Sequence, residues 1–347
     1  MPPENAAESA RIDALVEAAM PRIVAITGDM DFATFQTAAR VPKDMAGAGE
    51  VTRESFRMEA RLALLRRLET LWPDRRLLGV GHDVKVTLLP DSGKAAAVFV
   101  EPLLVAGRYR KLARGMSQTV FHCRACRGRR ADCEACGGSR RAVAEAVEDF
   151  IRPPIVSSVG ATRSSFHGSG REDIDVLMLG TGRPFVVSVQ WPHRRTIDAE
   201  SVAREVEVLS GGRVTVSDLE VVDRAAMRRI TMEHGVKSYR ATVRPLVQGS
   251  LPSDTRARLA SLVGVDIRQR TPERVEGRRA DLVRVRRVLA IEVEDASADC
   301  ATVHIRTEPG TYVKELISGD GGRTVPSFAS VLAQACACSM LDVVFVG

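Results

Sequence analysis

Long apolar runs are missing from this sequence of 347 residues. It contains no stretch of 18 apolar residues, so we expect no membrane-spanning helix. Its start, MPPENAAESARIDAL, lacks a charged segment followed by an apolar one. We therefore expect no secretion signal and a cytoplasmic location.

Nucleotide-binding loops are missing too. There is no GxxxxGK[ST] loop, which an ATP-dependent thiolation enzyme would use to hold phosphates. No Gly-rich loop follows a strand in a βαβ unit, as a methyltransferase that uses S-adenosylmethionine would require. Both absences argue against these enzyme classes.

Positive charge is present but unevenly distributed. The formal net charge is +6, yet residues 101–141 carry ten Lys or Arg against three Asp or Glu, so the rest of the chain sums to −1. A concentrated basic segment is typical of a protein that binds a polyanion. A solvated Arg-rich loop is the alternative, and charge alone does not separate the two.

Four of the seven cysteines form the pattern C-x2-C-x6-C-x2-C, namely Cys123, Cys126, Cys133 and Cys136. In a reducing compartment this spacing indicates a metal site, because two C-x-x-C pairs supply the four thiolates of a tetrahedral zinc. Four thiolates leave no open coordination position, so the zinc is expected to be structural. A redox pair or unrelated surface thiols fit two such pairs less well.

Periodicity predicts an α+β chain of two or three domains. Helices are expected over 8–20, after Thr52, and over residues 142–151, 199–209, 225–234, 254–262 and 312–317. The helix after Thr52 would bury Met58, Leu62, Leu65, Leu68 and Trp72, and that over 142–151 would stop at Pro153 and Pro154. Strands are expected over 83–89, 95–105, 173–179, 185–190, 213–222, 238–244, 282–294, 301–307 and 339–346. Few βαβ units favour a mixed or antiparallel sheet.

The segment HGSGREDIDVLMLGTG, residues 167–182, offers a candidate catalytic carboxylate. If a strand begins at Asp173, alternation puts Arg171, Asp173 and Asp175 on one face. Arg171 would then keep Asp173 ionised and fix its direction. Spacing alone favours the plainer interpretation of a structural ion pair at a strand end.

Four stretches in series change that balance. The sequence resembles the archaeal and eukaryotic pseudouridine synthases that act on the TΨC arm of tRNA in GRYRKLARGMSQT (107–119) with the cysteine pairs after it, GREDIDV with MLGTGRPFV (170–186), VKSYRATV (236–243) and GTYVKELISGDGGRTVPSF (310–328). The likeness runs, with interruptions, from about residue 98 to residue 332.

The resemblance implies a tRNA pseudouridine synthase acting on uridine 54, uridine 55 or both. It assigns catalysis to Asp173 (with Asp175 as rival) and substrate binding to Tyr239, Tyr312, Arg171 and Leu316. Lys314, Arg323 and Arg183 become candidate phosphate contacts. The implied domains are a THUMP-like RNA-binding domain over 1–120, the zinc knuckle over 121–141 and a pseudouridine synthase catalytic domain over 142–347. We expect tRNA as the partner, no organic cofactor and no obligate protein partner.

Some questions stay open from the sequence. Asp173 could attack C1′ of the ribose, or remove a proton from C2′ to give a glycal. Leu177 replaces a basic residue usual in the family, and Gln190, Trp191 and Pro192 replace a Lys-Asn-Pro-like run, which would weaken tRNA binding if those positions contact phosphate. A tRNA chaperone without chemistry is the alternative of another class.

Overall fold

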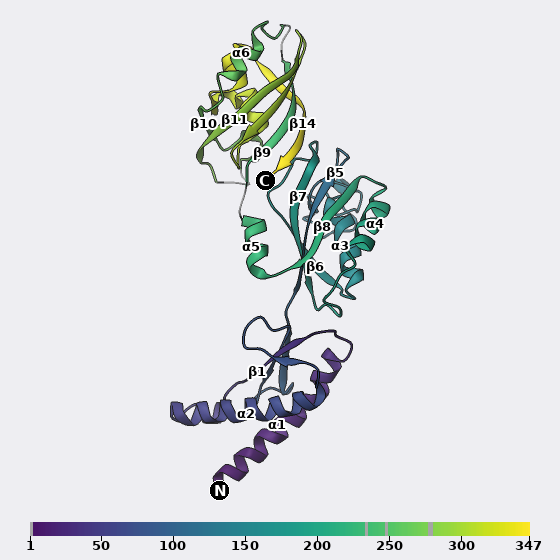
Figure 1. Ribbon diagram of the computed structural model, residues 1–347, viewed down its shortest axis with the longest axis vertical. Helices are drawn as coiled ribbons and strands as arrows, with labels where there is room; N and C mark the ends of the chain where they lie inside the picture. Colours follow the sequence, from purple (N-terminus) through teal and green to yellow (C-terminus); the bar gives the residue numbers. More distant parts are fainter. Residues whose placement is uncertain (1–2, 233–234, 247–248, 277–279) are drawn as a thin grey trace. The chain divides into compact units, whose positions relative to one another are not determined.

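The computed structural model describes residues 3–232, 235–246, 249–276 and 280–347, which form two compact units (Figure 1). Unit 1 runs to Leu103 and adds Ile155–Ser165 and Ser188–Asp198; unit 2 contains Leu104–Pro154, Phe166–Val187 and Ala199–Gly347. Both units mix helices and strands, so the α+β prediction is confirmed. The units divide after Leu103 rather than at residue 120, and the THUMP-like character of unit 1 stays a prediction. No described helix is long and apolar enough to cross a membrane.

Unit 1 packs two helices and a small sheet around one core. In the described residues its sheet has the order β2-β1-β3-β4. The elements are α1 (Pro3–Thr27), β1 (Thr34–Ala39), α2 (Glu50–Leu71), β2 (Arg76–Leu77), β3 (Val84–Leu88) and β4 (Ala96–Val100). Glu101 and Pro102 separate β4 from the next strand, so the single strand expected over 95–105 is in fact two.

The apolar face predicted for α2 is partly wrong. The buried residues are Phe56, Ala60, Leu64 and Leu68. Met58 and Leu62 are instead 47% and 42% exposed. Both sets repeat every four residues, so α2 carries two apolar stripes. The sheet of unit 1 selects the stripe with Phe56, which periodicity alone could not decide.

Unit 2 is built on a large mixed sheet. Its described strands run β13-β10-β11-β12-β9-β14-β7-β5-β8, with β6 paired to β7. They are β5 (Leu103–Lys111), β6 (Arg163–Gly168), β7 (Leu177–Gln190), β8 (Val214–Val222), β9 (Lys237–Pro245), β10 (Asp266–Arg270), β11 (Val283–Ala296), β12 (Ala301–Thr307), β13 (Thr324–Val325) and β14 (Cys336–Val346). Strand β14 is antiparallel to β9 but meets β7 in parallel at Asp342 and Val343, which confirms the expected mixed sheet.

The other helices are α3 (Val147–Ser158), α4 (Ala199–Ser210), α5 (Arg224–Met232), α6 (Thr255–Ala260), α7 (Val313–Ser318) and α8 (Phe328–Leu332). All belong to unit 2 except the end of α3 from Ile155, which belongs to unit 1. Helices α4 and α5 lie on opposite sides of the strands β5, β7 and β8 (Figure 1). Met227 and Ile230 of α5 pack on Ala106 and Val186. The helix expected over 225–234 is found to Met232, and His234 lies outside the described residues.

Two predicted elements begin later than expected. Helix α3 starts at Val147 and continues through Pro153 and Pro154. Asp149, the third residue of the helix, accepts hydrogen bonds from Arg141 and, in the manner of a capping box, from the Ala146 N–H, which fixes the start of the helix at Val147. Strand β7 starts at Leu177, so Asp173 lies in a loop before it, and the strand predicted over 173–179 is partly wrong.

Candidate active site

The loop before β7 is held by cations bound to its carbonyl groups. The side chain of Lys111 on β5 is fully buried, and its Nζ donates to the carbonyl oxygens of Met116 (2.8 Å), Asp173 (3.1 Å) and Ile174 (3.2 Å). Burial lowers the pKa of Lys111, against the attraction of nearby carboxylates. These carbonyls turn toward an ammonium group instead of a neighbouring strand, which explains why β7 begins only at Leu177.

A second cation extends this clamp. Arg114 donates to the carbonyl oxygen of Asp175 at 2.6 Å and to that of Leu341 at 3.1 Å. It also pairs with the buried carboxylate of Asp342 on β14. Lys111 and Arg114 lie inside GRYRKLARGMSQT, which the sequence singled out without a role for either residue. Their role in the fold is to fix the backbone that carries Asp173.

The Asp173 carboxylate faces two cations. It lies 3.0 Å from Arg274 and 3.3 Å from Lys314, and 39% of its side chain is exposed. Arg274 also binds Glu315 at 2.5 Å. Burial opposes the charge of Arg274, but Glu315 and Asp173 raise its pKa. A partly open carboxylate held between two fixed cations is both positioned and accessible, as a nucleophile or a base requires.

Arg274 replaces the residue that the sequence placed beside Asp173. The guanidinium of Arg171 lies over the ring of Phe121, 4.0 Å from its centre. Arg274 lies in the short 3-10 turn η3 (Glu273–Val275), about a hundred residues further along the chain. No motif marked this position, so sequence reasoning missed Arg274.

Asp175 has its own partner. Both of its carboxylate oxygens accept from Lys314 at 2.8 Å. Burial would raise the pKa of Asp175, but the hydrogen bond from Lys314 lowers it overall. Lys314 therefore links the two carboxylates that compete for the catalytic role. In this structure the ammonium group of Lys314 binds the carboxylates of Asp173 and Asp175. Its predicted contact with a phosphate stays a prediction.

A buried ion pair between Arg183 and Glu172 supports the loop that carries Asp173. Arg183 donates to Glu172 at 2.7 Å, and their side chains are 2% and 0% exposed. The hydroxyl of Tyr109 donates to the same carboxylate at 2.8 Å, and Gln118 donates to that hydroxyl. The prediction of Arg183 as a phosphate contact is wrong, because the side chain is buried against Glu172.

Tyr239 and Tyr312 lie on different elements of unit 2. Tyr239 is on β9, partly buried, and burial raises its pKa to about 12, so the hydroxyl is neutral at pH 7. Tyr312 caps α7, and its backbone exchanges two hydrogen bonds of 2.9 Å with the Gln269 amide. Leu316, one helical turn later, is fully buried, so of these two residues only Tyr312 has a surface that a substrate could contact. The substrate-binding roles of these residues stay predictions.

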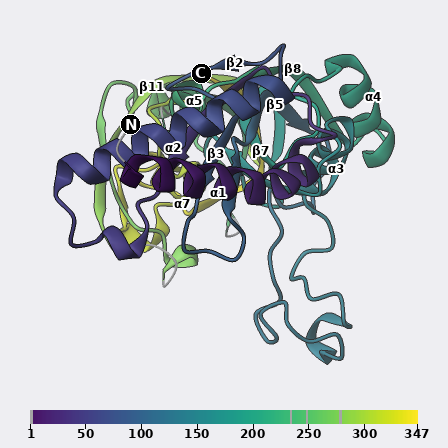
Figure 2. The same cartoon turned by 90° about the horizontal axis from the view of Figure 1, so that it is seen from below.

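The four cysteines come together as expected. Their sulfur atoms all lie within 4.8 Å of one another, and those of Cys126 and Cys136 are 3.9 Å apart. Ligands at about 2.3 Å from a tetrahedral zinc would have sulfurs roughly 3.8 Å apart, so the cluster fits that ion. A side chain at Gly138, which has φ +77°, would collide with the Ala131 carbonyl, so the fold of the knuckle (residues 121–141) requires glycine there. Figure 2 shows this segment as a long loop that projects from the rest of unit 2.

We expect one tightly bound zinc per chain, from the sulfur geometry above. Elemental analysis of protein purified without chelator should find stoichiometric metal. Replacing Cys126 with Ser should lower the metal content and loosen the knuckle, because the four cysteines form the hydrophobic cluster of this segment. Cys300→Ser is the matched control, since Cys300 lies far along the chain in no such cluster among the described residues. Metal-free wild-type protein with an ordered knuckle would contradict this prediction.

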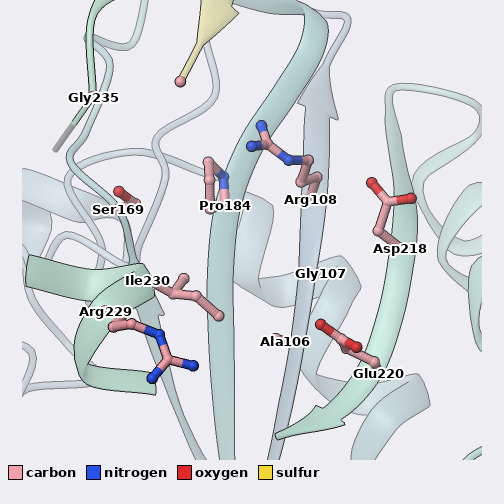
Figure 3. A pocket seen from close by; sticks show the side chains of 11 residues that line it. Ala106, Gly107, Arg108, Ser169, Pro184, Asp218, Glu220, Arg229, Ile230 and Gly235 are labelled. Atoms are coloured by element: carbon pink, nitrogen blue, oxygen red, sulfur yellow. The ribbon is translucent and has the colours of Figure 1, made fainter. Parts of the chain in front are cut away.

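A separate hollow of about 590 Å³ lies between α5 and strands β5, β7 and β8 (Figure 3). Arg108, Arg229, Asp218 and Glu220 contribute charged groups to its wall. Asp173, Tyr239 and Tyr312 are not among the described residues that line it. Positive and negative groups balance there, so this hollow does not share the chemistry of the loop that carries Asp173.

This chain is similar to several known proteins. The tRNA pseudouridine synthase Pus10 of Methanothrix thermoacetophila is 45% identical over 251 residues, which cover 72% of this chain and 54% of that protein. The protein of the same name from Halorubrum lacusprofundi is 35% identical over 333 residues, covering 92% of this chain and 77% of that protein. A chain of a solved Cbf5-Nop10-Gar1 complex is 18% identical, with a TM-score of 0.34, over 56% of this chain and 43% of that chain.

The chain spans about half of the length of the Methanothrix protein. Residues 104–347 match a family model described as the C-terminal part of Pus10. That match covers all of unit 2, including every residue of the loop around Asp173 and the whole cysteine knuckle. By this match and by its similarity to the Halorubrum protein over most of both chains, the chain belongs to the Pus10 family.

Proposed function

We propose that this chain is a tRNA pseudouridine synthase that converts uridine 54, uridine 55 or both in the TΨC loop to pseudouridine. The observation that carries the proposal is the Asp173 carboxylate, partly open and set between Arg274 and Lys314 on a clamped loop. The names of the relatives support the reaction class and the RNA substrate.

The reaction moves one bond of the target uridine. The base must leave the stack before an enzyme can reach its glycosidic bond. The bond from N1 to C1′ breaks, the uracil turns, and C5 bonds to C1′; C5 then gives up its proton, and N1 ends with one, so the product is an isomer of uridine. Asp173 either bonds to C1′ during this exchange or takes the proton from C2′ and later returns it. Both routes use the carboxylate of Asp173, which Arg274 and Lys314 hold in place.

The other groups act on position rather than on bonds. Lys111 and Arg114 hold the loop backbone, so the Asp173 carboxylate keeps its position when RNA binds. We assign Tyr239 to the face of the uracil, where a neutral hydroxyl can accept or donate a hydrogen bond. The exposed arginines of the knuckle would contact phosphates, and zinc, when bound, would supply structure only.

Unmodified tRNA incubated with the purified protein should gain pseudouridine in the TΨC loop. Sequencing of the chemically treated product would place the new residue at position 54, 55 or both. A control incubation with protein heated to loss of structure should leave both uridines unchanged. Tight tRNA binding by intact protein without any new pseudouridine would contradict the proposal and favour the tRNA chaperone.

A further inference from the structure

Lys237 is a cation to which the proposed mechanism assigns no role. It is the first residue of β9 and is partly buried. In the described part of the chain its ammonium group has no hydrogen-bonding acceptor or ion-pair partner. A charge removed from water without a partner is costly, and such groups are typical of functional sites.

The surroundings of Lys237 sharpen this observation. A side-chain carbon added at Gly170 would lie 3.0 Å from the Lys237 Nζ and 3.0 Å from a terminal nitrogen of Arg183. Both cations therefore reach the backbone of Gly170, three residues before Asp173. The charged groups that face Lys237 are Arg183 on β7 and Glu172 in the loop before it.

Charge in this cluster does not balance. Glu172 is bound directly by Arg183 at 2.7 Å, so the one carboxylate is already matched by one cation. The charge of Lys237 is then left over, with Arg183 repelling it. Burial and this repulsion lower the pKa of Lys237 to about 8. An anion supplied from outside would remove the imbalance.

The position of Lys237 indicates which anion fits. Tyr239 follows two residues later on the same strand, so both side chains leave the same face of β9, about 7 Å apart. Tyr239 is the residue we assign to the uracil, and a single nucleotide carries its base and its phosphate at a comparable separation. We propose that Lys237 binds a backbone phosphate of the target nucleotide while Tyr239 contacts its base. This inference rests on the proposed function and adds a phosphate site to it.

Two substitutions separate this role from proton transfer. Lys237→Met removes the charge, whereas Lys237→Arg keeps it and keeps the ability to bind phosphate. Each is placed in Asp173→Asn protein, so that tRNA binding is followed by filter retention without turnover. Lys94→Met is the matched control, because Lys94 is an exposed lysine in a turn of unit 1. Thermal melting of each variant checks the fold.

The Met variant should bind tRNA about tenfold more weakly, and the Arg variant within a few-fold of its parent. The slope of log affinity against log salt should fall by about 0.7 to 0.9 with Met alone, as one phosphate contact is lost. If the Met variant does not fold, the Arg variant still tests the site through pH. Bound phosphate favours charged lysine, so parent affinity should be full below pH 8 and fall above it, following the pKa of about 8. The Arg variant should show no such fall.

Two results would overturn the phosphate site. One is a Met variant that binds tRNA with the affinity and salt slope of its parent. The other is an Arg variant as defective as the Met variant, with the defect confined to turnover when Asp173 is restored, which would make Lys237 a proton-transfer group. Either result beside normal isomerisation by the wild-type protein leaves the proposed function standing. Absence of isomerisation by the wild type is a separate failure.

Discussion

Asp173→Asn should abolish pseudouridine formation while tRNA binding stays nearly intact. Asparagine has almost the same shape and still accepts a hydrogen bond from Arg274, so the loop should keep its fold. It has neither the negative charge to attack carbon nor the basicity to take a proton from C2′. The rate should fall by several powers of ten, each about 1.36 kcal/mol of barrier.

The measurement is single-turnover release of tritium from tRNA labelled at C5 of uridine, with binding followed separately. Asp175→Asn is the decisive comparison, because Asp175 shares Lys314 with Asp173, whereas the hydrogen bond from Arg274 goes to Asp173. Loss of release only in the Asp175 variant would transfer the catalytic role to that residue. Near-normal tritium release by the Asp173 variant would contradict the catalytic role of Asp173, on which the proposed mechanism depends.

Arg183→Met should cause the largest loss of stability of any single substitution considered for unit 2. It leaves the fully buried Glu172 carboxylate with the Tyr109 hydroxyl as its donor and no cation at contact distance. Breaking a buried ion pair from one side costs about 3 to 5 kcal/mol, because the remaining charge is uncompensated. Hydrogen exchange of the backbone amides of β7 would measure the loss, since it reports local stability in a chain of two units.

Two further variants make this result interpretable. Arg183→Met with Glu172→Gln removes both charges, and it should recover part of the protection. Arg213→Met is the matched control, because the Arg213–Glu145 pair is about 40% exposed on each side and should matter little. An Arg183 variant with wild-type protection of β7 would show that the pair contributes specificity rather than stability.

Sequence reasoning succeeded where local pattern decides structure. The strand over 301–307 and the spacing of the four cysteines depend on neighbours in sequence, and the structure confirms both. It failed where distant residues decide. Asp173 was placed on a strand because the pattern around it alternates, but the carbonyl groups of this segment are bound by Lys111, some sixty residues earlier. Alternation cannot report a buried ammonium from another strand.

The partners of Asp173 show the same limit. Arg171 was chosen because it is two residues away, whereas Arg274 reaches the carboxylate from a separate loop. Arg274 lies in a segment without periodicity or motif, so only the three-dimensional structure could identify it as a partner of Asp173. The sequence interpretation gave no role to Glu172, which lies between Arg171 and Asp173, yet its side chain is fully buried. Its partners are Arg183, eleven residues later, and Tyr109, 63 residues earlier.

Strand β14 has a consequence for the order in which this chain matures during synthesis. It lies between β9 and β7, and it follows every other described strand in the chain. A ribosome that has produced β7 and β9 has therefore made two parts of a sheet that cannot yet join. Asp342 on β14 is also the partner of Arg114, which holds the loop with Asp173. The nascent protein thus exposes unpaired strand edges until β14 has been made, and its loop gains its last support only when β14 docks.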